Sequence, residues 1–457
     1  MNARDYTPHP NLNPIIQAAL DRVDSAAVLE RCLKVEGNVL EVRTESEELG
    51  FDLSKFERLL VLAVGKAAGR MARALEALLG ERITAGVAIT KYGHAEPLSR
   101  LELFEAGHPV PDEEGVRAAR RLVELASEAD ERTLVITLIS GGGSALLADP
   151  YHDARREVSL SDMQEVTRLL LASGASIQEM NCLRKHLSGV KGGRLAAILA
   201  PATSLNLILS DVVGDDVASI ASGITASDPS TYSEALEIAR RFEVLERFPK
   251  SAREVIEAGA SGVIAETPDA GDPAFESVHN VIVGSNAQGL LAAEAAARTL
   301  GYETRVLTSR LTGEAREVGR LFPAIARDIR AKGMLAAPPA CILAGGETTV
   351  TIRDAQGTGG RNQELVVSAL REWARDAEEY GDAVFASVAT DGNDGPTDAA
   401  GAYIDRRLAS SAADHPAEVE RALVHNDSYH YFERHGGLIK TGPTNTNVCD
   451  IQVLLVE

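Results

Sequence analysis

The segment best suited to binding an anion is a run of three glycines between two serines: Ser140, Gly141, Gly142, Gly143 and Ser144. It directly follows the apolar run Leu134–Ile139, which the pattern predicts to be a buried strand. Consecutive glycines let backbone N–H groups converge on an oxyanion with no Cβ in the way, and a following helix would add its positive N-terminal end. We therefore expect this loop to bind a phosphate or a carboxylate.

Basic residues occur at two places where they could assist such a loop. Lys66 follows the apolar run Leu59–Val64, and a lysine at a strand-to-helix turn can bring a point charge to an anion. Taken alone, Lys66 fits a solvated helix start better. Residues 181–194 carry four cations, with Lys185 and Lys191 among them and Gly193 beside them. Such a set can offset phosphate charge, although an ordinary basic helix face would have the same composition.

Carboxylates follow other apolar runs in the same way. Asp211 comes after Asn206–Leu209, and a carboxylate leaving a strand end can hold Mg²⁺ or accept a proton from a hydroxyl. The C-terminal half has four more polar, glycine-rich segments. Three of them contain Glu347, Arg361, Asp391 and Asp394, and the fourth is Thr441–Asn447. A turn accounts for any one of these segments, but their shared content of Asp, Glu, Arg, Asn and Thr favours a common site over a series of unrelated turns.

Several familiar site types are excluded by their spacing. No G-x-x-x-x-G-K-[ST] motif occurs, and no G-x-G-x-x-G lies at a strand-to-helix turn. The loop from Asp391 does not match a calcium-binding EF-hand, because its twelfth residue is Ala402 and not a glutamate. The four cysteines form no C-x-x-C pair, so neither a zinc ribbon nor a redox motif is indicated.

Short apolar runs alternate with amphipathic helices along the chain, which is typical of an α/β protein with parallel strands covered by helices. The 457 residues are too many for one compact core. A stretch rich in Gly, Pro, Asp and Glu, Ser261–Ser277, is the best candidate for a boundary. We therefore expect two domains, residues 1–260 and 277–457, with strands at Val278–Val283 and Thr348–Ile352 in the second.

The net charge of −21, from 46 Lys plus Arg and 67 Asp plus Glu, argues against nucleic acid and anionic membrane surfaces as partners. Neither a secretory signal nor an apolar run long enough to span a bilayer is present. The expectation is a cytoplasmic protein. Its oligomeric state is left open, a homodimer included.

These segments together resemble the class II glycerate kinases, glycerate 2-kinases whose C-terminal part is called the MOFRL domain. The resemblance covers nearly the whole chain in order. Its most specific stretches are VGKAAGRMA (64–72), LISGGGSALL (138–147), NCLRKHLSGVKGGRLA (181–196), GGRNQEL (359–365), ATDGNDGPTDAAGA (389–402) and TGPTNTNVCDIQ (441–452).

The resemblance implies phosphorylation of D-glycerate at its 2-hydroxyl, dependent on ATP and Mg²⁺. It implies a larger Rossmann-like domain, a smaller α/β domain and an active site in the cleft between them. Lys66 and Arg361 would neutralise the transferring phosphoryl group, and Asp391 or Asp211 would orient or deprotonate the hydroxyl. The triglycine loop would bind either ATP phosphate or the glycerate carboxylate, with Lys185, Lys191 and Gly193 also on the cofactor, while Glu347 and Asp394 would contact Mg²⁺ directly or through water.

Two other functions fit the sequence less well. An NAD(P)H-dependent hydroxypyruvate reductase would need a hydride cofactor site, and the dinucleotide fingerprint is missing. A non-enzymatic regulator that binds sugar acids on the same scaffold would be expected to lack reactive residues, yet Lys66, Arg361 and Asp391 are all present.

Overall fold

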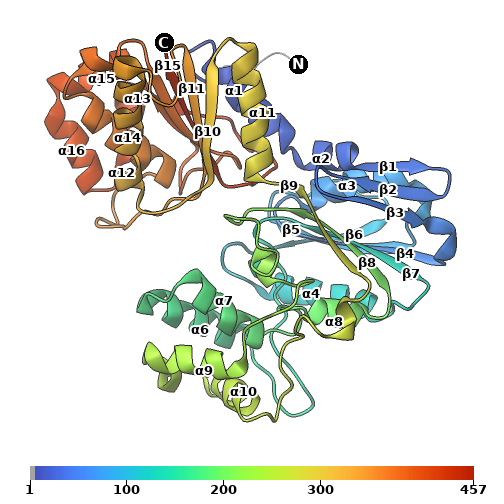
Figure 1. The fold of residues 1–457 in the computed structure, drawn as a ribbon. Helices are drawn as coiled ribbons and strands as arrows, with labels where there is room; N and C mark the ends of the chain where they lie inside the picture. Colours follow the sequence, from blue (N-terminus) through green and yellow to red (C-terminus); the bar gives the residue numbers. More distant parts are fainter. Residues whose placement is uncertain (1–5) are drawn as a thin grey trace. The chain divides into compact units, whose positions relative to one another are not determined.

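The computed structural model describes residues 6–457, and their contacts divide into two compact units (Figure 1). One unit comprises residues 28–283. The other comprises residues 6–27 together with 284–457. Each unit has its own six-stranded sheet and its own hydrophobic core.

The sheet of residues 28–283 has the strand order β6-β5-β4-β7-β8-β9. Its strands are β4 (Arg58–Val64), β5 (Ala85–Lys91), β6 (Leu101–Ala106), β7 (Thr133–Ile139), β8 (Thr203–Leu209) and β9 (Val278–Gly284). The central strands β4 and β7 pair in parallel from Arg58↔Thr133 to Val64↔Ile139. Every residue of β7 is buried, because helices cover both faces of the sheet and an apolar run satisfies both.

The order of the strands reverses between β4 and β7. From β4 the chain proceeds outward to β5 and β6, whereas β7 lies on the other side of β4 and is followed outward by β8. Parallel α/β sheets bind ligands beyond the carboxyl ends of their strands at such a reversal. The residues that follow Val64 and Ile139 therefore occupy the position where a ligand is expected.

Helices of the same unit either cover the sheet or form a group of their own. Those next to the sheet include α3 (Ala68–Leu79), α4 (Glu113–Ala126), the single turn α5 (Gly143–Leu146) and α8 (Arg194–Leu199). The start of α4 is well defined, since the Asp112 side chain accepts the Gly115 N–H and two glutamates occupy the first turn.

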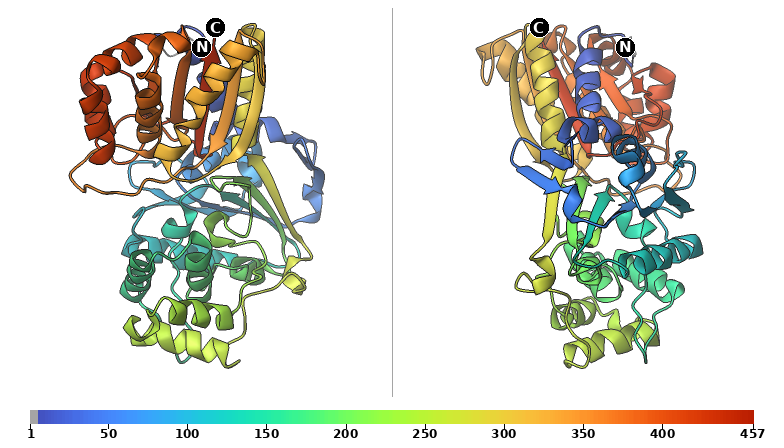
Figure 2. Two further views of the ribbon diagram at one scale, coloured as in Figure 1. Left: turned by 60° about the vertical axis from the view of Figure 1, so that its left-hand side comes forward. Right: turned by 90° about the vertical axis from the view of Figure 1, so that its right-hand side faces the viewer.

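The separate helical group consists of α6 (Leu160–Ser173), α7 (Ile177–His186), α9 (Tyr232–Arg241) and α10 (Lys250–Ala260). These helices share a second apolar cluster, and they lie together, green to yellow-green, in both views of Figure 2. A small antiparallel sheet completes the unit: β1 (Leu33–Glu36), β2 (Val39–Arg43) and β3 (Glu48–Asp52).

The other unit has a mixed sheet of order β10-β11-β15-β12-β13-β14. Its strands are β10 (Glu303–Leu311), β11 (Ala340–Gly346), β12 (Val384–Ala389), β13 (Gly401–Ile404), β14 (Leu438–Ile439) and β15 (Asp450–Val456). Only β10 and β11 pair in parallel among the pairs with a defined register. The last strand, β15, lies between β11 and β12, so residues next to it meet both flanking strands.

Eight helices surround this sheet in the described residues. They are α1 (Leu12–Arg22), α11 (Asn286–Thr299), α12 (Ala315–Val318), α13 (Leu321–Lys332), α14 (Arg361–Trp373), α15 (Arg406–Asp414), α16 (Pro416–Val424) and α17 (Ser428–His435), of which α12 is a single turn. Helix α14 is buried along most of its length, including Asn362, Gln363 and Glu364 in its first turn. None of the helices in the described part of the chain combines the length and apolarity needed to cross a bilayer.

The α/β fold class is confirmed, with a larger parallel-sheet unit and a smaller second one. The division into residues 1–260 and 277–457 stays a prediction about domains, and the contacts differ from it at two places. Helix α1 packs in the core of residues 284–457, since Leu12, Ile15 and Ile16 belong to that cluster. The expected strand Val278–Val283 exists as β9 but lies beside β8 in the first sheet.

One expected strand of the second sheet is absent from the described structure. Residues Thr348–Ile352 are predominantly irregular, with a single bridge between Thr349 and Glu314. The β-branched residues of this segment satisfy strand preference, but Gly346 ends β11 at a φ of 144° and turns the chain away.

Candidate functional site

Lys66 and the triglycine loop lie together at the strand-order reversal. The Lys66 N–H donates to the Gly141 carbonyl at 2.8 Å, and the Ala67 N–H donates to Ser140 Oγ at 3.1 Å. The loop is tied to β4 as well, because the Ser140 N–H donates to the Val64 carbonyl at 3.0 Å. Sequence segments more than 70 residues apart are thus fastened into one surface at the ends of β4 and β7.

Two glycines make this close approach feasible. Gly65 has φ 126°, and a Cβ there would lie 2.4 Å from the Ser140 carbonyl oxygen. Gly142 has φ 82°, and its Cβ would lie 3.0 Å from ring atoms of His108 and 3.1 Å from Lys66 Cγ. Both positions therefore require a residue without a side chain. The same geometry places His108 next to the loop.

A third loop completes this surface. Ala221, Ser222 and Gly223 all have positive φ, of 49°, 59° and 64°. Two consecutive left-handed residues other than glycine are energetically costly, and such strain concentrates at functional sites. Ser222 Oγ lies 2.7 Å from Ser144 Oγ, so the strained segment positions a hydroxyl beside the end of the triglycine loop.

Substituting Gly142 by valine is expected to abolish binding of the loop's anionic ligand, while the circular dichroism spectrum stays native. The added methyl groups would enter the space next to Lys66 and His108, and valine disfavours positive φ. Isothermal titration calorimetry with ATP and with D-glycerate measures the loss.

Gly174→Val is the matched control for this variant. Gly174 caps α6 at nearly the same backbone angle, φ 79°, but nothing lies within 4 Å of an added Cβ. It reproduces the backbone strain without the crowding. Normal binding of both ligands by Gly142→Val would refute the role of the loop.

Two of the predicted cofactor residues, Lys185 in α7 and Gly193 after it, have structural contacts. Lys185 is buried and its Nζ lies 3.1 Å from Oδ1 of the buried Asp228. The Gly193 N–H donates to the Gly223 carbonyl at 2.7 Å, and a Cβ on Gly193 would lie 2.8 Å from the Phe275 ring. These contacts account for Lys185 and Gly193 without a ligand, so their cofactor role stays a prediction that the geometry does not favour.

Asp211 directly follows β8 and Ser210, beside the strand that leads into the triglycine loop. It is half-buried. The next acidic residue with defined contacts, Asp216, acts as a cap, since its carboxylate accepts from the Ala218 N–H and from Ser219 Oγ. The structure thus separates Asp211, at a strand end, from a capping carboxylate a few residues on.

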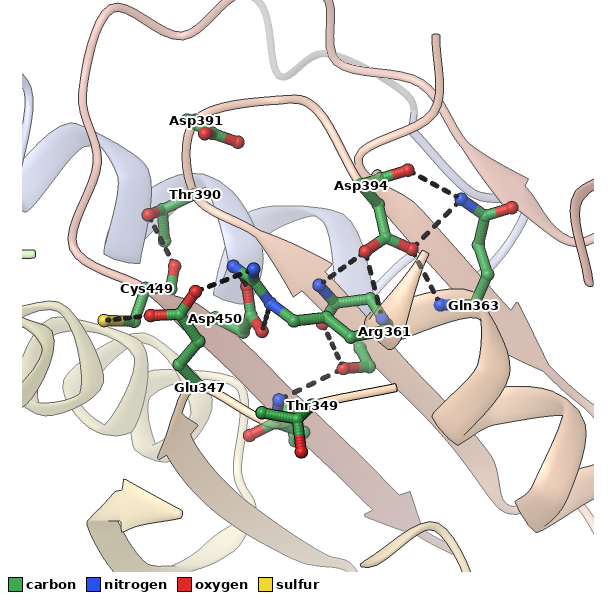
Figure 3. Close-up of polar contacts among 12 residues, drawn as sticks. Glu347, Thr349, Arg361, Gln363, Thr390, Asp391, Asp394, Cys449 and Asp450 are labelled. Carbon is green, nitrogen blue, oxygen red and sulfur yellow. Dashed lines mark hydrogen bonds and ion pairs between the residues drawn. The ribbon is translucent and has the colours of Figure 1, made fainter. Parts of the chain in front are cut away.

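The second group of predicted residues surrounds Arg361, at the start of α14 (Figure 3). Its guanidinium makes a two-pronged contact with Asp450, with Nε to Oδ2 at 2.6 Å and Nη2 to Oδ1 at 2.8 Å. Its third nitrogen, Nη1, lies 2.8 Å from Glu347 Oε1. Two carboxylates therefore fix one guanidinium in a single orientation.

Burial shapes the charges of this group. Asp450 is fully buried, which raises the pKa of its carboxyl, and the charge of Arg361 opposes this effect. Burial lowers the pKa of Arg361, but the charges of Asp450 and Glu347 outweigh it and the net shift is upward. Arg361 is therefore a permanently charged group held by two acids.

The carboxylate of Asp394 accepts hydrogen bonds from the start of α14. Its Oδ1 accepts the Asn362 N–H at 3.0 Å, and its Oδ2 accepts the Gln363 N–H at 2.9 Å. The side-chain amides of the same two residues donate to it as well (Figure 3). Asp394 thus satisfies the first N–H groups of α14, although burial raises the pKa of its carboxyl to about 6.

The metal assignment of Glu347 and Asp394 therefore stays a prediction. Throughout residues 6–457, no three His, Cys, Asp or Glu side chains are grouped as a metal site. Asp391 is half-buried at the start of its loop, and its Oδ1 accepts the Asn393 N–H at 3.0 Å.

Three residues of these surfaces were not singled out from the sequence. His108 follows the end of β6, so the rule that placed Lys66 and Ser140 at strand ends could have found it. Asp450 is the first residue of β15, and a single acidic residue before an apolar run does not by itself indicate a functional site. Ser222 had no pattern of its own, since its position depends on a left-handed backbone.

The fold defines a class: α/β proteins whose parallel sheet has a reversal of strand order, the point at which such sheets bind ligands. Comparisons with known proteins identify the family. A family model described as a domain of unknown function, DUF4147, matches residues 11–257, and the MOFRL family model matches residues 340–450.

Relatives of known name cover most of the chain. A glycerate 2-kinase from Pyrococcus horikoshii is 41% identical over 87% of this chain and 87% of its own. A protein from Agrobacterium vitis named as a putative hydroxypyruvate reductase is 42% identical, again over 87% of each chain. The crystal structure of a glycerate kinase from Thermotoga maritima has a TM-score of 0.80 and 36% identity, covering 97% of this chain and 98% of that one. The chain belongs to the glycerate 2-kinase family.

Proposed function

We propose that the protein is an ATP-dependent kinase that transfers the γ-phosphoryl group of ATP to the 2-hydroxyl of D-glycerate, giving 2-phosphoglycerate and ADP. The observation that carries the proposal is the position of Lys66, hydrogen-bonded through its backbone to the triglycine loop at the reversal of strand order. A loop of free amides beside a lysine is suited to an anion, and both substrates are anions. Membership of the glycerate 2-kinase family supports the same reaction.

The reaction needs positioned charge more than covalent chemistry from the protein. The 2-hydroxyl oxygen attacks the γ-phosphorus, the bond to the β–γ bridging oxygen breaks, and ADP leaves. We assign the neutralisation of phosphoryl charge to Lys66 and to Arg361. The hydroxyl proton passes to Asp391 or Asp211. The triglycine loop binds either the ATP phosphates or the glycerate carboxylate.

Mg²⁺ is proposed to enter as the complex with ATP, with Glu347 near Arg361 as the better placed of the two predicted contacts. Turnover is expected to be lost in excess EDTA and restored by added Mg²⁺, because the triphosphate charge must be neutralised for attack. A coupled assay of ADP release measures it. Undiminished turnover in EDTA would refute the metal requirement.

Hydroxypyruvate reductase is the second candidate, favoured only by the printed name of the Agrobacterium vitis relative. Incubating the enzyme separately with ATP and D-glycerate and with NADH and hydroxypyruvate distinguishes the two. We expect ADP formation in the first mixture and no change in NADH absorbance in the second. The reverse result would contradict the proposal.

The partners and the cellular location of the enzyme are proposed from its amino-acid composition. A net charge of −21 makes nucleic acid an unsuitable partner and is consistent with a cytoplasmic enzyme of small anionic substrates. Whether the protein forms a homodimer is a separate prediction, which sedimentation velocity would measure.

A further inference from the structure

The four cations of residues 181–194 have different partners in the structure. Lys185 pairs with Asp228. Arg194 donates from Nη1 to the carbonyls of Lys185 and Ser188, at 2.7 and 2.9 Å, and from Nη2 to the Tyr232 hydroxyl at 3.0 Å. The contacts of Lys185 and Arg194 therefore stabilise the fold.

Arg184 is the exception. Within residues 6–457 its guanidinium makes no hydrogen bond and no ion pair, although the side chain is half-buried. Burial alone lowers its pKa, and no carboxylate of the described chain offsets that effect. An arginine has five N–H donors in a planar fork, so this one retains its entire capacity for an oxyanion.

Lys191 shares the same surroundings. It is almost completely buried, and its Nζ has one long contact, 3.4 Å to the Leu147 carbonyl. Burial and, to a smaller extent, the charge of Arg184 lower its pKa to about 8, while Asp149 acts in the opposite direction. Two cations therefore lie within electrostatic range of each other, and the nearby acid acts on only one of them.

These cations adjoin the candidate site. Leu147 follows α5, the turn that begins at Gly143 of the triglycine loop. The Gly192 N–H, next to Lys191, donates to the carbonyl of Ser222, whose hydroxyl contacts Ser144. The segment that carries Lys191 is therefore fastened to the same strained loop that borders the anion-binding glycines.

We propose that Arg184 and Lys191 form an oxyanion subsite for one substrate of the kinase, with Arg184 as the group that binds the ligand directly. The proposal deepens the proposed function and rests on it. The ligand is either the carboxylate of D-glycerate or a phosphate of the nucleotide, since both present the oxygen pair that a guanidinium fork matches. Lys191, which is buried, adds positive charge to the subsite without contacting the ligand directly.

The effect of a substitution on the melting temperature distinguishes a ligand-binding arginine from a structural one. A half-buried cation without a counter-charge destabilises the free protein, so its removal is expected to leave the melting temperature unchanged or raise it. A structural arginine would show the opposite, a lowered melting temperature.

The test uses Arg184→Gln and Arg184→Lys in the full-length protein, with Arg240→Gln as control. Arg240 is an exposed arginine of α9 in the same unit, so its removal changes the net charge equally. Calorimetry gives the dissociation constants of D-glycerate and of Mg–ADP separately, and thermal unfolding gives the melting temperature. Neither readout needs turnover, so they stay valid even if phosphoryl transfer to glycerate is disproved.

We expect Arg184→Gln to weaken one of the two ligands about tenfold or more, with the other within about twofold of wild type. The affected ligand identifies the subsite. Arg184→Lys should recover only part of the loss, because an ammonium lacks the fork. Unchanged affinity for both ligands, or loss of both together with a lowered melting temperature, would overturn the proposal.

Discussion

Replacing Lys66 by alanine is expected to lower kcat by about two orders of magnitude or more, with little change in the melting temperature. The backbone N–H of Lys66 donates to the Gly141 carbonyl, and this bond does not depend on the side chain. The substitution therefore deletes the charge and keeps this bond to the loop. Steady-state kinetics with ATP and D-glycerate measure the effect.

Lys55→Ala serves as the control, because it removes an exposed lysine from the same unit and changes the net charge equally. It should have wild-type kinetics. A near-normal rate for Lys66→Ala together with a large fall in melting temperature would mean that Lys66 is a structural residue at a helix start.

Replacing Arg361 by methionine is expected to lower both activity and stability. Activity should fall by about 100-fold or more, because the cation proposed to act on the phosphoryl group is removed. Stability should fall by about 3–5 kcal/mol, because Asp450 is fully buried and would lose its two-pronged partner. Urea denaturation and the ADP-release assay measure the two effects.

The double variant Arg361→Met/Asp450→Asn separates those effects. Asparagine has no charge to leave uncompensated, so most of the lost stability should return while activity stays low. If activity returned with stability, Arg361 would be a fold-stabilising residue and not a reacting one. The single variant Asp450→Asn tests whether Asp450 positions Arg361. Because Arg361 then loses the carboxylate that orients it, we expect kcat to fall by a larger factor than KM rises.

Most of the first sheet could be predicted from the sequence. The runs Leu59–Val64 and Leu134–Ile139 correspond to β4 and β7. Such runs are informative because a parallel strand is buried on both faces and must be apolar throughout. Once the strands are known, the residues after them are placed at one edge, which is why Lys66 and Ser140 could be anticipated.

The features that were missed depend on long-range packing. Helix α1 is amphipathic, but nothing in its pattern says which core it joins, and it packs with residues 284–457. Arg361 and Asp450 are 89 residues apart, so their pairing follows only from the position of β15 in its sheet. The basic set 181–194 looked uniform, yet burial and partners assign its members different roles.

The central claim is that this protein phosphorylates D-glycerate on its 2-hydroxyl with ATP. The most direct test is to incubate the purified enzyme with ATP, Mg²⁺ and D-glycerate and to identify the product by ³¹P and ¹H NMR. The account predicts 2-phosphoglycerate and ADP in equal amounts, with the phosphorus coupled to the proton on C2. A product with phosphorus coupled to the C3 protons, or ATP hydrolysis without any phosphorylated glycerate, would contradict it.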